Sequence, residues 1–251
     1  MAIKKELIKL IDKGLNWFDL ELGIKQSRED KEDLYQFLQY VHQNQESYSQ
    51  LYQDLFVQYI LNDKKSGFFV EFGATDGITL SNTYLLEKKY GWKGVLAEPA
   101  KIWHSKLSRN RTAHIDTRCV WSQSGEVLQF SEVSDAAEIS TLTSFTELNK
   151  QSAASDNVYE VLTISLNDLL GTANAPKLID YLSVDTEGSE YEILRNFDFE
   201  RWDVSVISVE HNFFPIRDKI YQLLKSKGYV RKFPLLSRWD DWYVKSDIGK
   251  S

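Results

Sequence analysis

Acidic residues and glycines gather in three short segments of the sequence, each of which directly follows an apolar run. The segments are EFGATDG at 71–77, DTEGSE at 185–190 and EHN at 210–212. Glycine allows a tight turn and a close approach of the backbone to a ligand. Carboxylates accept hydrogen bonds from hydroxyls, bind cations and move protons. The three segments therefore predict one or more ligand sites.

The first segment favours a positively charged cofactor over a dinucleotide. A dinucleotide fingerprint has the form G-x-G-x-x-G, whereas here Gly73 and Gly77 stand four residues apart beside Glu71 and Asp76. Two carboxylates would repel a pyrophosphate but would suit an amino group or a sulfonium. Glu98 ends the next apolar run, where an acid can accept hydrogen bonds from both ribose hydroxyls. Ribose and a cation without pyrophosphate indicate S-adenosylmethionine rather than NAD.

The second and third segments predict metal binding or proton transfer. Asp185, Glu210 and His211 would form a set of ligands for a divalent ion such as Mg or Mn. Such an ion lowers the pKa of a bound hydroxyl and makes it a nucleophile at neutral pH. Without a metal, His211 or Glu187 is the candidate general base. The alternative is that Glu210 and His211 only form hydrogen bonds in the cleft or pair with each other.

The elements that must position these segments alternate in the sequence. From Gly67 onward, short apolar runs are followed in most cases by helical patterns, which is typical of an α/β fold with a doubly wound, mostly parallel sheet. In such a sheet, ligands bind beyond the carboxyl ends of the strands, and the strands before Asp185 and Glu210 would be neighbours. The predicted strands lie at 68–72, 94–97, 113–121, 178–184 and 204–209, the helices at 78–90, 101–109, 185–197 and 216–227, and an antiparallel pair at 229–235 and 241–244.

The first 66 residues carry helical spacing, at 3–18 and 27–61, and no strand signal. We therefore predict a helical extension at 1–66 and a catalytic domain at 67–251. The Lys-rich helix at 3–18 would lie on a membrane surface, dock a partner, or pack on its own domain or a second subunit.

Composition excludes several classes of protein. The chain has 251 residues, a net charge of −7 and 42% hydrophobic residues, which is ordinary for a globular protein. The acidic balance argues against a nucleic-acid binder. The single cysteine, Cys119, excludes an internal disulfide and a multi-thiolate zinc site. Because this cysteine usage fits a reducing compartment, we expect a cytoplasmic protein.

Several motifs together resemble the FkbM family of S-adenosylmethionine-dependent methyltransferases. They are GFFVEFGATDG at 67–77, SNT at 81–83, LE at 86–87, GWKG at 91–94 with Glu98-Pro99, DYLSVDTEGSE at 180–190, VEHN at 209–212, the Gln50 and Gln53-Asp54 segment upstream, and DDW at 240–242. The resemblance covers roughly residues 49–246. It implies a class I methyltransferase (Rossmann-like) sheet with an antiparallel C-terminal strand, and methyl transfer to hydroxyls of sugars, glycans or natural products.

The resemblance also implies roles for individual residues. Glu71, Gly73 and Asp76 would line the methionine end of the cofactor, Glu98 its ribose and Ser122 its adenine. We add Ala74, Gly77, Asn82 and Asp185 to the predicted cofactor-binding residues. Thr75 stands where the general class has the middle glycine of E-x-G-x-G-x-G. Asp185, Glu210 and His211 are similar by position to the metal ligands of catechol O-methyltransferase-like enzymes, although a histidine departs from that all-oxygen set.

The sequence thus predicts an O-methyltransferase that acts on a small-molecule or glycan acceptor and takes no nucleic acid. Asp185, Glu187 and His211 are its predicted catalytic residues. An NAD(P)-dependent oxidoreductase is the first alternative, and a catalytically silent interaction module with the same fold is the second. The presence of Asp185, Glu187, Glu210 and His211, whose side chains can bind a metal or transfer a proton, argues against the silent module.

Overall fold

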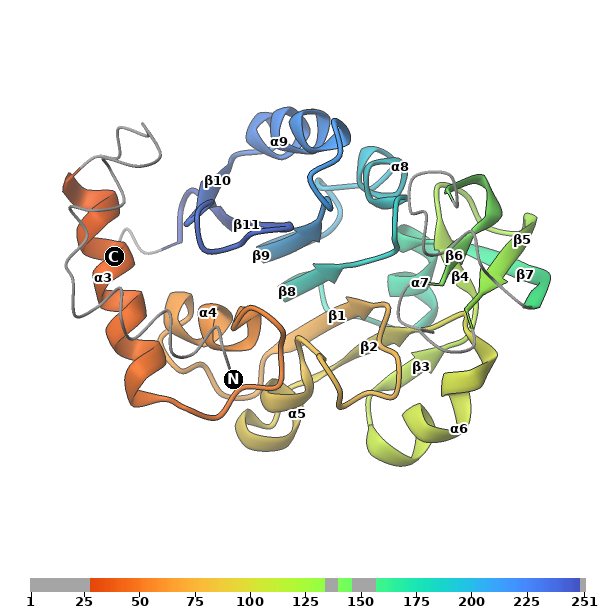
Figure 1. Ribbon diagram of the computed structural model, residues 1–251, viewed down its shortest axis with the longest axis horizontal. Helices are drawn as coiled ribbons and strands as arrows, with labels where there is room; N and C mark the ends of the chain where they lie inside the picture. The colour runs from red at the N-terminus through yellow and green to blue at the C-terminus, as the bar shows by residue number, and fades with distance from the viewer. Residues whose placement is uncertain (1–27, 134–139, 146–156, 249–251) are drawn as a thin grey trace.

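The computed structural model describes residues 28–133, 140–145 and 157–248. Its centre is a seven-stranded sheet with the order β10-β11-β9-β8-β1-β2-β3 (Figure 1). The strands are β1 Phe68–Phe72, β2 Lys93–Ala97, β3 His114–Asp116, β8 Leu178–Val184, β9 Asp203–Glu210, β10 Tyr229–Lys232 and β11 Asp240–Lys245. The strand order reverses between β1 and β8, so the topological switch point lies there.

One strand gives the sheet its mixed character. β11 pairs antiparallel with both β9 and β10, whereas the pairs of β1 with β2, β1 with β8 and β8 with β9 are parallel. The mostly parallel sheet with an antiparallel C-terminal strand that the sequence predicts is therefore present. In the register of β8 and β9, Val184 is opposite Val209. The residues that follow these two, Asp185 and Glu210, thus leave the sheet side by side.

Helices cover both faces of the sheet, because successive strand residues point to opposite sides. Val70, Leu182 and Ile207 face a core shared with α7, α8 and α9. Phe69 and Tyr181 face the opposite core, which α3 to α6 complete. The helices are α3 Arg28–Gln43, α4 Gln53–Ile60, α5 Tyr84–Tyr90, α6 Lys101–Asn110, α7 Leu166–Thr172, α8 Glu190–Arg195 and α9 Ile216–Ser226.

The residues before Gly67 share this second core. Phe56 of α4 lies fully buried against Trp242 of β11, with ring centroids 4.7 Å apart. Phe37 of α3 stacks on Phe233 at 5.3 Å. The predicted boundary at residue 66 therefore marks a change in secondary structure, whereas the packing continues across it. The predicted helix at 3–18 lies outside the described residues.

A second sheet of four strands, in the order β4-β7-β5-β6, stands beside the main one. Its strands are β4 Cys119–Trp121, β5 Val127–Glu132, β6 Thr141–Leu142 and β7 Asn157–Ser165, and a short 3₁₀ turn, η2 Thr143–Phe145, follows β6. Cys119, Phe130 and Leu142 form its buried core together with Ala100 and Val161. In Figure 1 this sheet lies next to the ends of β2 and β3.

Several sequence predictions need correction. The helix predicted at 185–197 covers only α8, and the helical spacing at 27–61 is divided between α3 and α4. The strand predicted at 113–121 is two strands, β3 and β4, which belong to different sheets. The chain turns between them at Arg118, whose guanidinium pairs with Asp116 two residues before it, at 2.6 Å. The helix predicted from Ile78 begins only at Tyr84, because the polar residues 81–83 bind the side chain of Glu71 instead. No helix among the described residues is both long and apolar enough to span a membrane.

Candidate functional site

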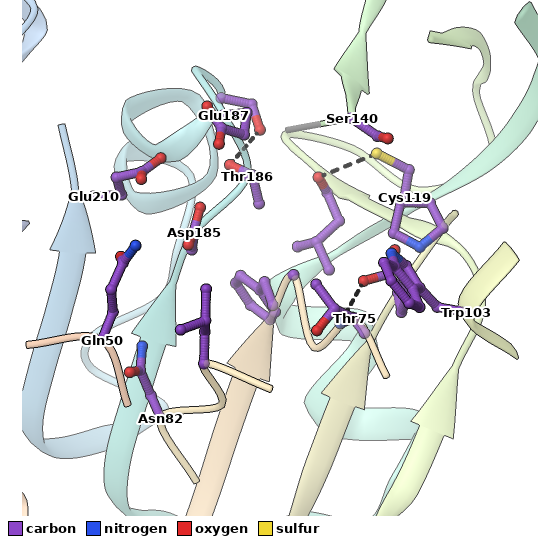
Figure 2. Close-up of a pocket in the computed structure, with 18 of the residues that line it drawn as sticks. Gln50, Thr75, Asn82, Trp103, Cys119, Ser140, Asp185, Thr186, Glu187 and Glu210 are labelled. Atoms are coloured by element: carbon purple, nitrogen blue, oxygen red, sulfur yellow. Dashed lines mark hydrogen bonds between the residues drawn. The ribbon is translucent and has the colours of Figure 1, made fainter. Parts of the chain in front are cut away.

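A cavity of about 750 Å³ opens at the carboxyl ends of the central strands. The ends of β1, β2, β8 and β9 all contribute residues to it: Gly73, Glu98, Asp185 and Glu210. Figure 2 shows a close-up in which the acidic side chains gather on one side and Trp103 and Cys119 on the other. The cavity therefore has an acidic end and an apolar end, and the position at the switch point is the one expected for a ligand site in this architecture.

The turn after β1 brings the backbone close to β8. Gly73 has a φ of +67°, and a Cβ at this position would lie 2.7 Å from the carbonyl oxygen of Asp185. Only glycine fits such an approach without strain. Two residues on, Thr75 lines the cavity with a φ of +46°. The middle position of the family motif thus adopts a left-handed conformation without being glycine.

Glu98 ends β2 inside the cavity and is held by the backbone. Its carboxylate accepts hydrogen bonds from the N–H groups of Thr75 and Ala100, both at 2.8 Å. Burial raises the pKa of Glu98 to about 7, and the charges of Glu132 and Glu71 act in the same direction, against these hydrogen bonds. Each carboxylate oxygen keeps a lone pair for a further donor. Glu98 is therefore ready to accept hydrogen bonds from a ligand in the cavity.

Asp76 shapes the loop that leads away from Gly73. Its carboxylate accepts hydrogen bonds from the backbone N–H groups of Ile78 and Thr79, at 2.9 and 2.8 Å, and from the Thr79 hydroxyl. Burial alone would raise its pKa, but these hydrogen bonds lower the pKa below the ordinary value. Asp76 lines the cavity together with Lys106, whose positive charge acts in the same direction.

Glu71 is buried behind the cavity and serves its loop. Its carboxylate accepts hydrogen bonds from the Ser81 hydroxyl, the Asn82 backbone N–H at 2.6 Å and the Thr83 hydroxyl at 2.5 Å. Arg111, whose side chain is fully buried, lies 3.4 Å from it. The structure therefore places Glu71 in a positioning role, whereas the sequence predicted a contact with the cofactor.

Three other predicted cofactor residues also lie outside the cavity lining. Ala74 is buried, and Gly77 packs where a Cβ would meet the side chains of Arg111 and Leu107 at 2.6 and 2.8 Å. Ser122 follows β4 in the second sheet, while Cys119 and Val120 of that strand line the cavity. The strand predicted at 113–121 is divided into β3 and β4. The residues of this segment that face the cavity are therefore Cys119 and Val120 and not Ser122. Gly73, Asp76, Asn82, Glu98 and Asp185 do line the cavity.

The apolar end is a slot between α6 and the second sheet. Pro99, Trp103, Val120, Phe130 and Leu142 line it. The Nε1 of Trp103 is buried and has no hydrogen-bond partner within residues 28–133, 140–145 and 157–248. A flat, mostly apolar group with one acceptor nitrogen would fill this slot and satisfy that donor. Sequence reasoning missed these residues because Phe130 and Leu142 come from strands outside the main sheet.

The acidic end brings together three carboxylates. One oxygen each of Asp185, Glu187 and Glu210 lies within 4.8 Å of the others. Burial and the neighbouring Glu187 charge raise the pKa of Asp185 well above its usual range, and burial and Asp185 do the same for Glu210. Asp240 lies in the same cavity wall, where burial raises its pKa to about 6. Such carboxylates are poised to hold a proton or a cation.

His211 lies away from this group. Its Nδ1 accepts a hydrogen bond from the backbone N–H of Phe213 at 3.0 Å, and its Nε2 is 3.7 Å from Asp241. Asp241 also pairs with Arg217 and Arg231. His211 does not line the cavity and does not join the three carboxylates. The predicted set of Asp185, Glu210 and His211 is therefore replaced in the structure by Asp185, Glu187 and Glu210.

Residues from an early and a late part of the chain meet at the acidic end of the cavity. Gln53, at the start of α4, donates a hydrogen bond from Nε2 to Asp240 at 2.7 Å. Gln50 accepts one from the indole N–H of Trp239 at 3.0 Å. All four residues line the cavity. Their motifs were visible in the sequence, but only the fold shows that they meet.

Four residues of the cavity lining have a strained backbone. Thr75, Leu80, Glu187 and Asn212 line it, and all four have φ between +45° and +59°. A residue other than glycine in this region costs about 1–2 kcal/mol. Such strain commonly marks ligand sites, where the surrounding structure holds the turn in place.

The sequence match agrees with this site. Residues 71–231 match the family described as the methyltransferase FkbM domain. The chain belongs to this family and is therefore a methyltransferase. The fold of a doubly wound sheet with a strand-end cavity is the one that such a cofactor-binding enzyme requires. Comparison with curated proteins gives no match.

Three solved structures have a limited likeness to this chain. Precorrin-6y C5,15-methyltransferase from Geobacter metallireducens is 12% identical, with a TM-score of 0.38 and 71% of each chain covered. The METTL16 methyltransferase domain, without its N-terminal segment, is 11% identical, with a TM-score of 0.39 and coverage of 78% of this chain and 81% of that one. Human methyltransferase 10 domain containing protein is 12% identical, with a TM-score of 0.39 and coverage of 96% and 95%.

Proposed function

We propose that the protein transfers a methyl group from S-adenosylmethionine to a hydroxyl of a sugar, glycan or natural-product acceptor. The observation that carries this proposal is that one cavity joins a ribose-type carboxylate, Glu98, to a group of half-buried carboxylates at Asp185, Glu187 and Glu210. The first suits the cofactor that the family implies, and the second suits removal of a proton from a hydroxyl.

The residues of the cavity fit that cofactor. Glu98 keeps lone pairs for the two ribose hydroxyls, and the apolar slot beside it, which Trp103 lines, suits a flat base. Gly73 leaves room for close approach of a ligand to the backbone. The acids at the other end favour a sulfonium. When bound, S-adenosylmethionine supplies an electrophilic methyl group on positively charged sulfur.

The acidic end would then take the proton of the acceptor hydroxyl. As the carbon–oxygen bond forms and the carbon–sulfur bond breaks, the hydroxyl proton passes to a carboxylate of Asp185, Glu187 or Glu210. Burial raises the pKa of Asp185 and Glu210, which brings these carboxylates closer to the pKa range of an effective general base. Asp185 and Glu187 thus remain the proposed catalytic residues.

A divalent cation is a second way in which this group could lower the pKa of the hydroxyl. Three carboxylates within reach of one another form an all-oxygen set, which suits Mg or Mn. His211 would not contribute, because its Nδ1 accepts a backbone hydrogen bond and its Nε2 faces Asp241. If the enzyme uses a metal, excess chelator abolishes turnover and Mn²⁺ or Mg²⁺ restores it. Full turnover in chelator assigns the hydroxyl proton to the carboxylates alone.

A thermal-shift comparison tests the proposal against its rivals. S-adenosylhomocysteine should raise the melting temperature, whereas NAD and NADP should not. Stabilisation by a nicotinamide dinucleotide alone would overturn the methyltransferase proposal in favour of an oxidoreductase. Cofactor binding without methylation of any acceptor in a panel of hydroxylated sugars and glycans would favour the silent interaction module.

A further inference from the structure

The two ends of the cavity differ sharply in charge. Among the described residues that line it, Lys106 is the single basic side chain, and it lies on the apolar side, 5.2 Å from the Trp103 ring. Asp185, Glu187, Glu210 and Asp240 all line the opposite end. An acceptor carrying a phosphate, sulfate or carboxylate would meet these acids with no described cation to balance it. Nucleotide-activated sugars are therefore poor occupants.

A second observation comes from another element, the loop before α5. The side chain of Asn82 is nine-tenths buried and lines the cavity. Its Nδ2 donates a hydrogen bond to Ser183 at 2.9 Å, while its Oδ1 has no partner among the residues that the structure describes. Figure 2 shows Asn82 on the same side as Asp185, Glu210 and Gln50. The protein thus holds an acceptor-only oxygen in a buried position, where an unmade hydrogen bond is costly.

Several of the polar donors nearby are already used. Gln53 Nε2 donates to Asp240, and Asn212 Nδ2 donates to Glu187 at 3.3 Å. The hydroxyls of Thr186 and Ser189 donate to Glu190 and to Thr186. The acidic end therefore offers many hydrogen-bond acceptors and few donors. A complementary ligand must bring donors, and a positive charge as well.

An ammonium group meets both needs, since it carries three N–H donors and one positive charge. A neutral polyol brings donors alone. We infer that the acceptor carries a free amino group beside the hydroxyl that is methylated, as in an amino sugar or an aminocyclitol. This inference rests on the proposed function. The ammonium binds among the carboxylates and Asn82 Oδ1 and so orients the neighbouring hydroxyl toward the cofactor. The reaction that supplies this acceptor must leave its amine unacylated.

Calorimetric titration of the protein saturated with S-adenosylhomocysteine, in chelator, tests the inference without requiring turnover. The probes are matched pairs: methyl glucosaminide with its N-acetyl derivative, and 2-deoxystreptamine with its di-N-acetyl derivative. At least one free amine should bind roughly tenfold or more tightly than its acetylated partner. Equal affinities, or no binding by any free amine, overturn the inference. Weak binding of S-adenosylhomocysteine in the same experiment counts separately, against the proposed function.

Variants locate the effect. Asn82→Ala and Glu187→Gln should each weaken binding of the free amine by roughly tenfold and leave the acetylated probe unchanged. Glu160→Gln removes the same charge from an exposed position on β7 and should change neither affinity. A final titration omits the chelator and adds Mn²⁺. Competition between Mn²⁺ and the amine supports a shared cation site, whereas Mn²⁺ binding that the amine does not displace assigns the carboxylates to metal and overturns the inference.

Discussion

Glu98 shows how burial changes the pKa of a single side chain. Its pKa of about 7 lies well above the ordinary value of 4.5 because the carboxylate is buried near Glu132 and Glu71. The ionised form accepts stronger hydrogen bonds from ribose hydroxyls than the protonated form. The affinity for the cofactor should therefore depend on the charge of this one residue.

We predict that the affinity for S-adenosylhomocysteine falls as pH drops from 8 to 6, by up to tenfold per unit below the Glu98 pKa. The stability of the free protein should change in the opposite direction. Since the unfolded chain ionises first, the Glu98 contribution to unfolding free energy decreases as pH rises from about 4.5 to about 7. Calorimetry of the wild type and Glu98→Gln checks both. An equally steep profile in Glu98→Gln would contradict the assignment.

Arg111 holds two buried acids at once. Its guanidinium lies 2.7 Å from Glu87 and 3.4 Å from Glu71, and all three side chains are buried. Although burial acts to raise it, the pKa of Glu87 is lowered to about 2, chiefly by the Arg111 charge. The same guanidinium bonds to the hydroxyls of Ser81 and Thr83, so it also fixes the loop that carries Asn82.

Replacing Arg111 with methionine should cost about 3–5 kcal/mol of unfolding free energy, because two acids lose their buried partner. Denaturant unfolding at pH 7 measures this loss. The double variant Arg111→Met/Glu87→Gln should recover part of it, since one uncompensated charge is removed. A loss below 1 kcal/mol in the single variant would show that water reaches the pair.

His211 organises the turn after β9. Its Nδ1 fixes the backbone at Phe213, and its Nε2 faces Asp241, which Arg217 and Arg231 also hold. The pKa of Asp241, which burial alone would raise, is lowered by these neighbours. The turn carries Glu210 and Asn212 at the cavity wall. His211 is thus a positioning residue that acts through its neighbours.

His211→Ala should lower kcat about tenfold or more while the affinity for S-adenosylhomocysteine changes little. The pH profile of kcat distinguishes the two roles of the imidazole. If His211 only positions the turn, the profile keeps its shape in the variant. If the imidazole were the general base, the acidic limb of the profile would disappear.

At the level of elements, β2 packs tightly against β1 at Gly94. A Cβ added at Gly94 would lie 2.3 to 2.4 Å from the Phe69 ring and backbone oxygen. Because Phe69 is fully buried, neither group can move aside. The two strands whose ends carry Gly73 and Glu98 are therefore aligned by this contact.

Gly94→Ala should destabilise the protein by about 3 kcal/mol or more, measured by chemical denaturation. Gly125→Ala is the matched control. Gly125 has a φ of +84°, but a Cβ there meets nothing within 4 Å, so only the backbone strain of about 1 kcal/mol is expected. A similar loss in both variants would contradict the importance of the Phe69 contact.

The sequence could predict those site residues whose position depends on the strands alone. Gly73, Glu98 and Asp185 each follow a parallel strand and Glu210 ends one, and such strands end at one edge of a sheet. The direction of a side chain is a different matter. Glu71 precedes the end of β1 and points into a buried network, and His211 turns toward Asp241. Local pattern does not determine such directions, because the partners come from distant parts of the chain.

The residues of the apolar slot could not be predicted from the sequence either. Phe130 and Leu142 pair on neighbouring strands of the second sheet. Their placement beside the cavity depends on the break at Arg118, which a strand pattern from 113 to 121 does not reveal. Ser122 was consequently placed too far along the chain.

Across the whole molecule, the helices before Gly67 complete the core on one face of the sheet. Phe56 contacts Phe37, Phe233 and Trp242. Phe56→Ala should therefore cost about 3–5 kcal/mol, and thermal and denaturant unfolding should show a single transition. A separate, early transition of α3 and α4 would indicate an independent extension. The exposed Tyr35→Ala on α3 serves as the control and should change stability little.

The hydrogen bond between Gln53 and Asp240 joins residues 187 positions apart. Contacts between residues far apart in the sequence form late in folding, because the entropy of closing a long loop is lost before the contact contributes any stabilising free energy. During synthesis, β1 and β2 can leave the ribosome long before Asp240 does, and domains generally fold as units. The acidic end of the cavity is therefore assembled only after β11 has been made. A nascent chain that stalls before β11 would carry Gly73 and Glu98 but would lack Asp240 and the wall that it forms at the acidic end of the cavity.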